Sequence, residues 1–434
     1  MMAAIASGSF FANKNIHAKI AIVERHNKIG RKLLATGNGH CNLSNLNITE
    51  EDIGEHYYSE SPLLFRTVLN GFMPERTINF FEKIGVLCHS RDDGKIYPFC
   101  EQAYSVVEAM EQELNFLGVK IILDSEVVEL SKTDNCFQLD LAASDSLFAD
   151  KVIVSAGGKA SPALSSNGLG YDLLKRFSHT CTELFPAIVQ LKTETDFIAP
   201  LAGTRWNAEI RLVRVTFDRN HMEKGEIIRK ETGELLFTKY GISGPPVLQL
   251  ARHIQKSSSH HQEDVECDTS HFVLIDFMNE FNSAQLVDIL SDRIAGFGKR
   301  TIRQLLIGML PFKIAGALVR KNFPSRENQC ISTISPKDLA LIVTQIKNFP
   351  LKITGTTGWD EAQITAGGIK CTEIDEKTLE SRFCGGLYIA GEILDVDGDC
   401  GGYNLQFAWA SGHAAGESAA KAIYKEHKEI KIER

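Results

Sequence analysis

At 434 residues the chain is too long for one ordinary hydrophobic core, so we expect two or three domains. Its composition, 43% hydrophobic and 24% charged, is that of a globular protein, and a net charge of −8 provides no overall electrostatic footprint for nucleic acid or an anionic membrane. No apolar stretch approaches the roughly 20 residues that span a bilayer, the N-terminus lacks the layout of a secretory signal, and the ten cysteines include no CxxC pair.

These absences also predict the location of the protein, the state of its thiols and the partners that it lacks. We expect a cytoplasmic protein with mostly reduced thiols, no nucleic-acid partner, no membrane partner and no metal site, while the oligomeric state stays open. His260 and His261 are the one adjacent histidine pair. They lie in a polar run from Lys256 to Ser270, which favours a solvated insert over a metal site.

The first predicted strand, Lys19 to Val23, ends in Glu24. In a dinucleotide-binding fold such an acid binds the ribose hydroxyls, about 20 residues after a GxGxxG turn. That turn is absent, because Met1 to Phe11 has the pattern of the helix that would follow it, and Ser7-Gly8-Ser9 is a weaker anion nest. Losing about three charge-assisted bonds of roughly 1.5 kcal/mol each would lower nucleotide affinity on the order of a thousandfold. Since every later motif is intact, we favour a start codon placed too late over a decayed homologue.

The next dense signal is GRKLLATGNGHCNLSN, from Gly30 to Asn45. Arg31 and Lys32 supply positive charge, and the turn from Thr36 to Gly39 offers φ > 0 positions with polar side chains. Such a loop suits a diphosphate or the edge of an isoalloxazine ring, although surface turns often look the same. Cys41 has no second cysteine nearby, which favours a small packing residue over a redox thiol.

The middle of the chain changes character near Val189. Before it, a helical region is followed by strands predicted at 119–123, 127–130, 137–141 and 148–154. The last strand leads into Ala156-Gly157-Gly158, a turn that permits close backbone approach. After Val189, short β-rich segments extend to Phe277, and amphipathic helices follow. We therefore expect an insertion made of a β-rich subdomain, 189–281, and a helical subdomain, 282–349.

The chain then returns to its first domain, 350–434, which contains GLYIAGEILDVDGDCGGYNLQFAWASG. The apolar run Leu387 to Ala390 predicts a buried strand, and Gly391 at its end lets backbone approach a ligand without an intervening Cβ. A glycine-rich loop follows, and then helical spacing from Leu405 to Ala420, so the loop amides point from a helix N-terminus. This favours a cradle for an anionic group over a simple tight corner.

Separated segments of the chain resemble the BaiN/YhiN-type FAD-dependent flavoproteins, a family of oxidoreductases. They are the two stretches quoted above, SAGGKASP, FTKYGISGPPVLQL and AQITAGGI. The chain departs from the family pattern at His40, where the family usually has Arg, and by lacking the strand and GGGAAG-like turn before Met2. The resemblance implies an α/β fold: a Rossmann-like FAD-binding domain, 1–188 and 350–434, that lacks its GxGxxG turn and carries the inserted β-rich and helical subdomains.

The resemblance also implies which residues contact FAD. Val127 and Val128 would lie against the adenine, and the 156–158 turn near the ribityl diphosphate. The Gly367-Gly368 turn would approach the flavin ring, and one of the acids in the last motif would bond the ribityl chain. Asn404 and Gln406 would meet the pyrimidine end of the ring. The predicted cofactor-binding set is Glu24, Arg31, Lys32, Thr36, Gly37, Asn38, Gly39, Cys41, Asn42, Val127, Val128, Ala156, Gly157, Gly158, Gly367, Gly368, Gly391, Glu392, Asp397, Gly398, Gly401, Gly402, Tyr403, Asn404 and Gln406.

The implied function is an FAD-dependent oxidoreductase acting on a small organic substrate by hydride transfer, in a crevice between the flavin domain and the insertion. The family is linked to reduction of unsaturated ring or steroid-like carbons, or to oxidation of small amines. Because no second GxGxxG unit is present, NAD(P)H would dock only transiently as the reductant, and oxygen is the alternative route of reoxidation.

Two other functions stay open at this point. One is a flavin-domain homologue with lost or weakened cofactor binding that acts as a binding or regulatory protein. The other, a disulfide reductase, would need a cysteine pair beside the flavin. No catalytic acid or base is assigned, since His40, Tyr240, Glu392 and Tyr403 suit cofactor positioning equally well.

Overall fold

The computed structural model describes residues 1–434 except 135, 165, 218–222, 260–268 and 433–434, so His260 and His261 lie outside the described residues. The chain forms two compact units: unit 1 is Met1–Pro186 with Gln363–Arg434, and unit 2 is Ala187–Ala362. The first boundary lies close to the expected residue 188. The return lies at 363 instead of 350, because the strand Phe349–Thr356 pairs with strands of unit 2.

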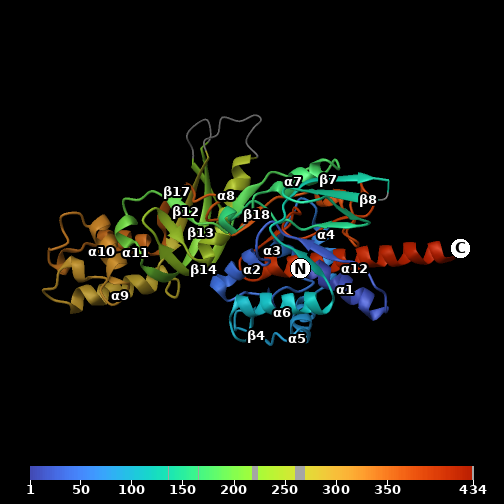
Figure 1. The fold of residues 1–434 in the computed structure, drawn as a ribbon. Helices are drawn as coiled ribbons and strands as arrows, with labels where there is room; N and C mark the ends of the chain where they lie inside the picture. Colours follow the sequence, from blue (N-terminus) through green and yellow to red (C-terminus); the bar gives the residue numbers. More distant parts are fainter. Residues whose placement is uncertain (135, 165, 218–222, 260–268, 433–434) are drawn as a thin grey trace. The chain divides into compact units, whose positions relative to one another are not determined.

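Unit 1 is built around one long helix, α12, drawn in red in Figure 1. Its helices are α1 (Met2–Asn13), α2 (Arg31–Ala35), α3 (Ile53–His56), α4 (Pro62–Gly71), α5 (Pro74–Lys83), α6 (Ala103–Phe116), α7 (Leu169–Lys175) and α12 (Tyr403–Ile432). Within the described part of the chain, none of the helices combines the length and apolar character needed to cross a bilayer.

The strands of unit 1 form several small sheets. They are β1 (Ala21–Val23), β2 (Ser44–Asn45), β3 (Tyr57–Tyr58), β4 (Cys88–Ser90), β5 (Lys95–Pro98), β6 (Lys120–Ile122), β7 (Val127–Thr133), β8 (Cys136–Leu141), β9 (Leu147–Ala149), β10 (Val152–Val154), β11 (Phe185–Ala187), β18 (Ile364–Ala366), β19 (Leu387–Ile389) and β20 (Asp397–Gly398). Two pairs are parallel, β1 with β6 and β10 with β19, and β7, β8 and β9 form an antiparallel sheet. Parallel strands flanked by helices are the expected α/β architecture.

In each parallel pair, the strand that comes first in the sequence, β1 or β10, is hydrogen-bonded along one edge only among the described residues. The Lys120 N–H bonds the Ile20 carbonyl, which places β6 on one edge of β1, and the Val152 N–H bonds the Gly386 carbonyl, which places β19 on one edge of β10. Residues 379–381 cover the outer edge of β19. Among the described residues, no strand pairs with the second edge of β1 or of β10. Helices must therefore contribute most of the support of these strands.

The two ends of unit 1 meet where α1 packs on α12. The packing is close because glycines of α12 face α1: a Cβ at Gly412 would lie 3.1 Å from Met2 Cβ, and one at Gly416 would collide with the Ala3 carbonyl. The Ser7 hydroxyl donates to the Gly416 carbonyl at 2.7 Å across the same interface. Small residues at helical spacing thus let the two backbones approach.

Unit 2 contains a closed six-stranded barrel in the order β12-β15-β14-β13-β16-β17. Its strands are β12 (Leu191–Thr193), β13 (Arg205–Phe217), β14 (Glu223–Phe237), β15 (Gly241–Ser243), β16 (Thr269–Asp276) and β17 (Phe349–Thr356). Alternate residues of β13, namely Ala208, Ile210 and Leu212, are fully buried, as the period of two for a strand requires. The β-rich pattern of the sequence therefore closes into a barrel.

The α-helices among the described residues of unit 2 are α8 (Pro245–Ser259), α9 (Ser283–Gly296), α10 (Phe312–Asn322) and α11 (Pro336–Lys347). Of these, α9, α10 and α11 lie in the region where the sequence predicted amphipathic helices, whereas α8 lies in the stretch that was expected to be β-rich. Asn282 and Ser335 begin α9 and α11 with capping boxes, in which the cap side chain and the third helical residue satisfy each other's backbone N–H groups.

The close packing of α1 against α12 predicts whether a substitution at Gly416 raises or lowers the free energy of unfolding. Ala in place of Gly normally stabilises a helix by about 1 kcal/mol, but at Gly416 the added Cβ meets the α1 backbone. We expect Gly416→Ala to lower the free energy of unfolding by about 1–3 kcal/mol in denaturant titrations. Gly71→Ala, at the end of α4 where a Cβ meets nothing within 4 Å among the described residues, is the matched control and should be neutral or stabilising. Equal behaviour of the two variants would contradict this packing.

Candidate functional site

The loop after β19 opens with a glycine that borders open space. Gly391 has φ +81°, and a Cβ built there would meet no heavy atom of the described residues within 4 Å. Its N–H donates to Ser411 Oγ of α12 at 3.0 Å, which holds the loop in place. The backbone at this point is therefore available for close approach by a ligand.

Glu392 ties this loop to two other segments. Its Oε2 lies 2.6 Å from Nζ of Lys32 in α2, and its Oε1 accepts the Thr365 N–H of β18 at 2.9 Å. The Glu392 and Lys32 side chains are 21% and 27% exposed, so water screens the ion pair only partly. One carboxylate thus joins residues more than 300 positions apart.

Thr365 adds the glycine turn after β10 to the same group. Its Oγ1 accepts the N–H groups of Lys159 and Ala160 at 2.7 and 3.0 Å. A Cβ at Gly158 would collide with Thr365 Oγ1, so a larger residue does not fit there. A Cβ at Gly157 would lie 3.8 Å from Glu392 Oε2; Gly157 is half-buried and Ala156 is exposed. Four separate segments therefore converge on Glu392 and Thr365.

The predicted turn Thr36–Gly39 forms a single turn of 3-10 helix in which Gly37 and Asn38 are left-handed. The Thr36 hydroxyl donates to the Leu33 carbonyl at 2.6 Å, which ties the turn to α2. A Cβ at Gly39 would meet no described atom within 4 Å, so this turn also borders open space. His40, the departure from the family pattern, lies 3.3 Å from Glu101 on the surface.

Asn42 leaves a buried acceptor unused. Its Oδ1 is shielded from water and has no hydrogen-bond partner among the described residues. A Cβ at Gly402 would lie 3.0 Å from this atom and would collide with the Ser44 carbonyl, so the glycine lets the backbone of the last motif pass close to Asn42. Because a buried acceptor without a donor is costly, this atom marks a place for a ligand N–H or O–H. A flavin ring N–H or a ribityl hydroxyl is such a donor, so the residues present fit FAD.

Cys41 is buried beside this site and does not behave as a redox thiol. Burial raises the pKa of its thiol to about 12, the Thr36 hydroxyl partly opposes this shift, and nearby Cys88 adds to it. The thiol therefore stays protonated at neutral pH and supplies no thiolate nucleophile. This favours the packing role.

Two predicted ligands of the ring prove to serve the protein itself. Gln406 is fully buried, and its side chain bonds Ser44, Thr77 and the Phe72 carbonyl. The Asn404 side chain accepts the Gly398 N–H at 2.8 Å and donates back to the Gly398 carbonyl. Both amides are occupied in shaping the loop, so we remove them from the proposed cofactor contacts. Sequence alone could not separate these roles, because an amide suits both.

Several predicted glycines also face protein backbone instead of open space. A Cβ at Gly367 would collide with the Glu183 carbonyl, one at Gly368 with the Leu394 backbone, and one at Gly402 with the Ser44 carbonyl. Gly398 and Gly401 are closed in by the side chains of Tyr403 and Lys95. Glycine is needed at these positions because another group lies very close, as expected. That group is part of the protein itself and not a ligand.

The remaining polar groups of the last motif are held by a small aromatic cluster. Asp399 Oδ2 lies 3.1 Å from His56 Nδ1, and Asp399 Oδ1 accepts from the Tyr58 hydroxyl at 3.2 Å. The Tyr403 ring packs 4.6 Å from the His56 ring, and Asp397 is 1% exposed. Of the acids considered for the ribityl chain, Glu392 is therefore the one beside open backbone.

Glu24 lies at a second place, near the start of α1. Its backbone bonds Ile122 and Ser125, which brings the end of β1 beside β6 and the approach to β7. Burial lowers the pKa of the Met1 amine to about 6, and the nearby Glu24 carboxylate opposes that shift. The predicted adenine contacts, Val127 and Val128, follow Ser125 by two and three residues, and Val128 is 50% exposed.

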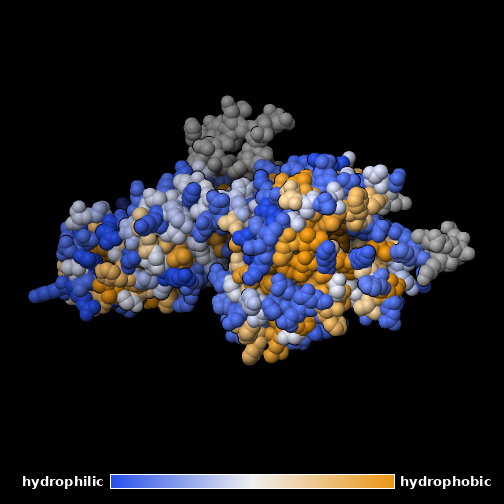
Figure 2. Space-filling model, in the orientation of Figure 1, coloured by the Kyte–Doolittle hydropathy of each residue, from blue (hydrophilic) through white to orange (hydrophobic). Residues whose placement is uncertain are grey.

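Arg31 connects the two places. It contacts His26 Nδ1 at 2.7 Å, two residues beyond Glu24, and precedes Lys32 in α2. Figure 2 shows a broad hydrophobic area on unit 1, around the positions where N and α3 are labelled in Figure 1. An exposed apolar area of this kind commonly marks a binding surface.

Asp395 is a buried acid that the sequence analysis did not single out. It is 4% exposed, and burial raises its pKa to about 6, with Asp397 adding to the shift and the hydrogen bond from the Glu60 N–H opposing it. The Glu60 N–H reaches its Oδ2 at 2.9 Å and the Thr182 hydroxyl reaches its Oδ1 at 3.2 Å. Three aspartates at alternate positions in DVDGD are the signal that could have revealed it, because neighbouring carboxylates disfavour joint ionisation.

The raised pKa of Asp395 predicts a pH dependence of stability. The folded state retains a proton that the unfolded state releases near pH 4, so stability should fall as pH rises from about 4 to about 6 and then level off. The full penalty is about 3 kcal/mol. We expect Asp395→Asn to gain stability relative to the parent protein across this window, measured by thermal melting at a series of pH values. Parallel pH profiles for the two proteins would contradict the assignment.

Within the described residues, no three His, Cys, Asp or Glu side chains gather in a way that would hold a metal ion. Of the predicted site residues, Lys32, Gly391 and Glu392 are joined by the contacts described above, and Glu24 lies at a second place near Val127 and Val128. Thr365 and Ser411 are the residues that the structure adds to the group around Glu392.

Comparison with known proteins agrees with this assignment. The chain is 37% identical over 426 residues to the 3-dehydro-bile acid delta(4,6)-reductase of Clostridium scindens, covering 97% of this chain and 96% of that protein. It is 28% identical over 424 residues to the ribosomal RNA dihydrouridine synthase of Haemophilus influenzae, covering 96% of each. The corresponding synthase of Escherichia coli is 26% identical over 410 residues, covering 93% of this chain and 92% of that protein.

The family described as HI0933-like protein Rossmann domain matches residues 1–418. This confirms the resemblance to the BaiN/YhiN-type proteins and the Rossmann-like α/β fold expected from the sequence. The chain therefore belongs to the HI0933-like family of Rossmann-fold, FAD-dependent flavoprotein oxidoreductases.

Proposed function

We propose that the protein is a reductase that adds two hydrogens to a ring carbon–carbon double bond of an organic substrate, with FAD as hydride carrier and NAD(P)H as transient electron donor. The observation that carries this proposal is the convergence of four segments on Glu392 and Thr365, beside open backbone at Gly391. That arrangement supports a cofactor site on unit 1.

The names of the relatives support the reaction class. One relative is a delta(4,6)-reductase and two are dihydrouridine synthases. A dihydrouridine is a uridine whose ring double bond has been saturated, so both names describe addition of two hydrogens to a ring. When bound, a flavin reduced by a hydride from NAD(P)H would supply a hydride to one carbon of such a bond while a proton joins the other carbon, which returns the flavin to FAD.

The residues of this chain would hold the cofactor by charge and by hydrogen bonding. Glu392 would accept from ribityl hydroxyls, and Asn42 Oδ1 would accept from the ring or the ribityl chain. Lys32 pairs with Glu392 at 2.6 Å, and the open backbone at Gly39 and Gly391 would admit the cofactor. Glu24 would bind the ribose of the adenosine half, with Val127 and Val128 beside the adenine.

The competing function is a binding or regulatory protein that keeps the flavin scaffold without catalysis. Both functions share the fold, so the fold does not separate them. They differ in whether the purified protein binds FAD and passes electrons to an acceptor.

Glu392 provides a test of the cofactor site. Loss of one charge-assisted hydrogen bond should weaken FAD binding about 10- to 100-fold, so we expect Glu392→Gln to raise the Kd by this factor in flavin-fluorescence titrations. Glu129→Gln is the matched control, because Glu129 pairs with Arg176 on the surface of the same unit. Unchanged FAD affinity in Glu392→Gln, with thermal melting showing a folded protein, would remove Glu392 from the site.

The reaction is tested by anaerobic reduction. NADPH or NADH added without oxygen should bleach the visible absorption of the bound flavin, and a cyclic enone such as a 3-oxo-Δ4,6 steroid should then restore the colour. Recovery of colour with the enone shows that the substrate accepts the two electrons. Failure of both nicotinamides to bleach the flavin would contradict the reductase, and stable bleaching that only oxygen reverses would contradict this class of substrate.

A further inference from the structure

Saturation of a carbon–carbon double bond consumes a proton as well as a hydride. The π bond breaks and a new C–H bond forms at each carbon: one carbon takes the hydride, which carries both electrons, and the other takes the proton. The proton comes from water or from an acid of the protein. An acid held in position speeds such a transfer by about 10²- to 10⁴-fold.

His56, the last residue of α3, is attached to the last glycine-rich motif by three contacts. Its carbonyl accepts the Asp399 N–H at 2.9 Å, and its Nδ1 lies 3.1 Å from Asp399 Oδ2. Its ring packs 4.6 Å from the Tyr403 ring, between centroids. The next residue, Tyr57, begins β3 and pairs with Gly398 of β20. The position of His56 is therefore set by this motif.

The same motif borders the atom that marks a place for a ligand. Asn42 Oδ1 is buried and has no hydrogen-bond partner among the described residues, and a Cβ at Gly402 would lie 3.0 Å from it. Tyr403 follows Gly402 directly and carries the His56 ring on its own ring. His56 thus belongs to the part of unit 1 where a ligand donor is expected.

Asp399 fixes which nitrogen of the His56 ring carries a proton. An ionised carboxylate only accepts hydrogen bonds, so Nδ1 is the donor in this pair. Asp399 Oδ1 also accepts from the Tyr58 hydroxyl at 3.2 Å, and the Asp399 side chain is 6% exposed, so the carboxylate is held in place.

The second ring nitrogen of His56 is available for proton transfer. Nε2 makes no hydrogen bond within the described part of the chain, and the His56 side chain is 28% exposed. Histidine is the side chain that readily holds and releases a proton near neutral pH, and a carboxylate on Nδ1 orients it for that purpose. The pair therefore has the geometry of an oriented general acid.

Other titratable groups of the site are already committed. Glu392 pairs with Lys32 and accepts a backbone N–H, and Asp395 is 4% exposed with an acceptor bond on each oxygen. Burial raises the pKa of the Cys41 thiol to about 12, so this thiol gives up its proton with difficulty. These groups are less suited to donate than His56.

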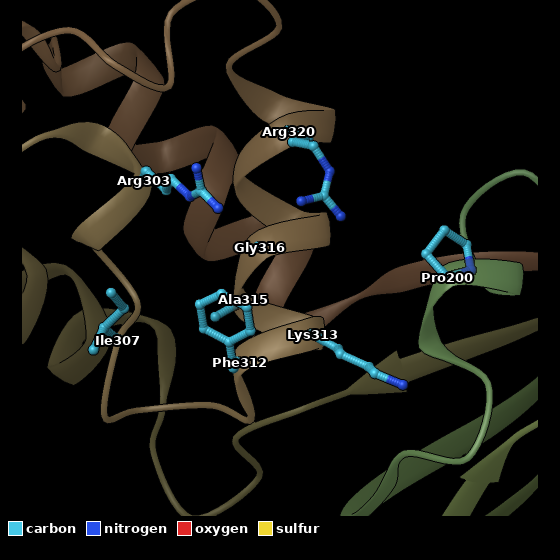
Figure 3. Close-up of a pocket in the computed structure, with 8 residues that line it drawn as sticks. All are labelled: Pro200, Arg303, Ile307, Phe312, Lys313, Ala315, Gly316 and Arg320. Atoms are coloured by element: carbon cyan, nitrogen blue, oxygen red, sulfur yellow. The ribbon is translucent and has the colours of Figure 1, made fainter.

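A pocket beside α10 in unit 2 does not provide such an acid either. Its charged lining residues are Arg303, Lys313 and Arg320, and the described residues that line it include no carboxylate and no histidine. Figure 3 shows these three side chains on and beside α10. Lysine and arginine keep their protons at neutral pH, so the pocket offers no efficient proton donor.

From these observations we infer that His56 is the proton donor of the proposed reduction and that Asp399 is its positioning residue. The imidazolium gives its Nε2 proton to the carbon that does not take the hydride. Nδ1 keeps its proton toward Asp399, and the neutral ring regains a proton from water. This inference rests on the proposed function, because the step exists only if the protein reduces a double bond.

The first test is a single turnover. FAD-loaded protein is bleached with NADPH without oxygen and mixed with a 3-oxo-Δ4,6 steroid, and the reduced steroid is measured over time. His56→Gln should slow its formation at least about 100-fold at saturating steroid and leave the rate of bleaching within about twofold. His17→Gln, which removes an exposed histidine of unit 1, is the matched control and should change neither rate.

Two further variants separate proton donation from support of the fold. In His56→Ala, added imidazole should restore much of the lost rate, because a free acid can enter the vacated space. Asp399→Asn should slow the turnover at least about tenfold while the half-saturating steroid concentration stays within about twofold, because the ring loses its fixed tautomer and not its contact with substrate.

A second readout does not depend on turnover. Diethylpyrocarbonate modifies accessible imidazole nitrogens, and mass spectrometry of peptides locates the modified histidines. In the FAD-loaded parent protein, saturating 3-oxo-Δ4,6 steroid should protect His56 from this reaction and leave the exposed His17 unprotected. This measurement also decides the matter if a substitution at His56 unfolds the protein in thermal melting.

The outcomes distinguish the two proposals. A parent protein that is bleached but forms no reduced steroid would contradict the proposed function and the role of His56 with it. A parent protein that forms reduced steroid, while folded His56→Gln forms it at the same rate, would overturn the role of His56 alone. Equal modification of His56 with and without steroid, in a parent protein that turns over, would do the same.

Discussion

The proposed site depends on the Glu392 carboxylate and its two partners. Glu392 draws the Lys32 ammonium and the Thr365 N–H together, and Thr365 in turn accepts two N–H groups from the turn after β10. These residues lie far apart in the sequence and belong to segments that are too short to be stable alone. A single partly buried acceptor with several donors fixes their positions, and it does so beside backbone that is open to a ligand.

Local patterns in the sequence predicted the strands and turns of this site correctly. They did not predict which distant residues these elements contact. The run Leu387 to Ala390 and the left-handed turn at Gly37 depend on residues close in sequence, and both are found where expected. The role of Gln406 depends on Ser44 and Thr77, more than 300 residues away, so its loss as a cofactor ligand could not be foreseen. For the same reason the strand at 349–356 was placed in the wrong unit, because its pairing partners decide where it belongs.

The two units differ in the chemistry that they offer. Unit 1 supplies glycine-lined backbone, one half-buried carboxylate and an apolar surface, which suit an aromatic cofactor with a polar chain. Unit 2 supplies a barrel and a segment, 282–349, that is rich in lysine and arginine. A composition averaged over 434 residues mixes these opposite characters, so the charge of each unit is more informative than that of the chain.

The contact of α1 with α12 also constrains the order in which the parts of the protein can fold during synthesis. Unit 2 is one continuous segment and can fold as it leaves the ribosome, whereas unit 1 needs residues from both ends of the chain. Until translation reaches α12, α1 lacks the helix that its backbone approaches most closely, and the contacts between the two helices are among the most distant in sequence that the described residues make. Unit 1 is therefore the part of the molecule that keeps apolar surface exposed for longest during synthesis.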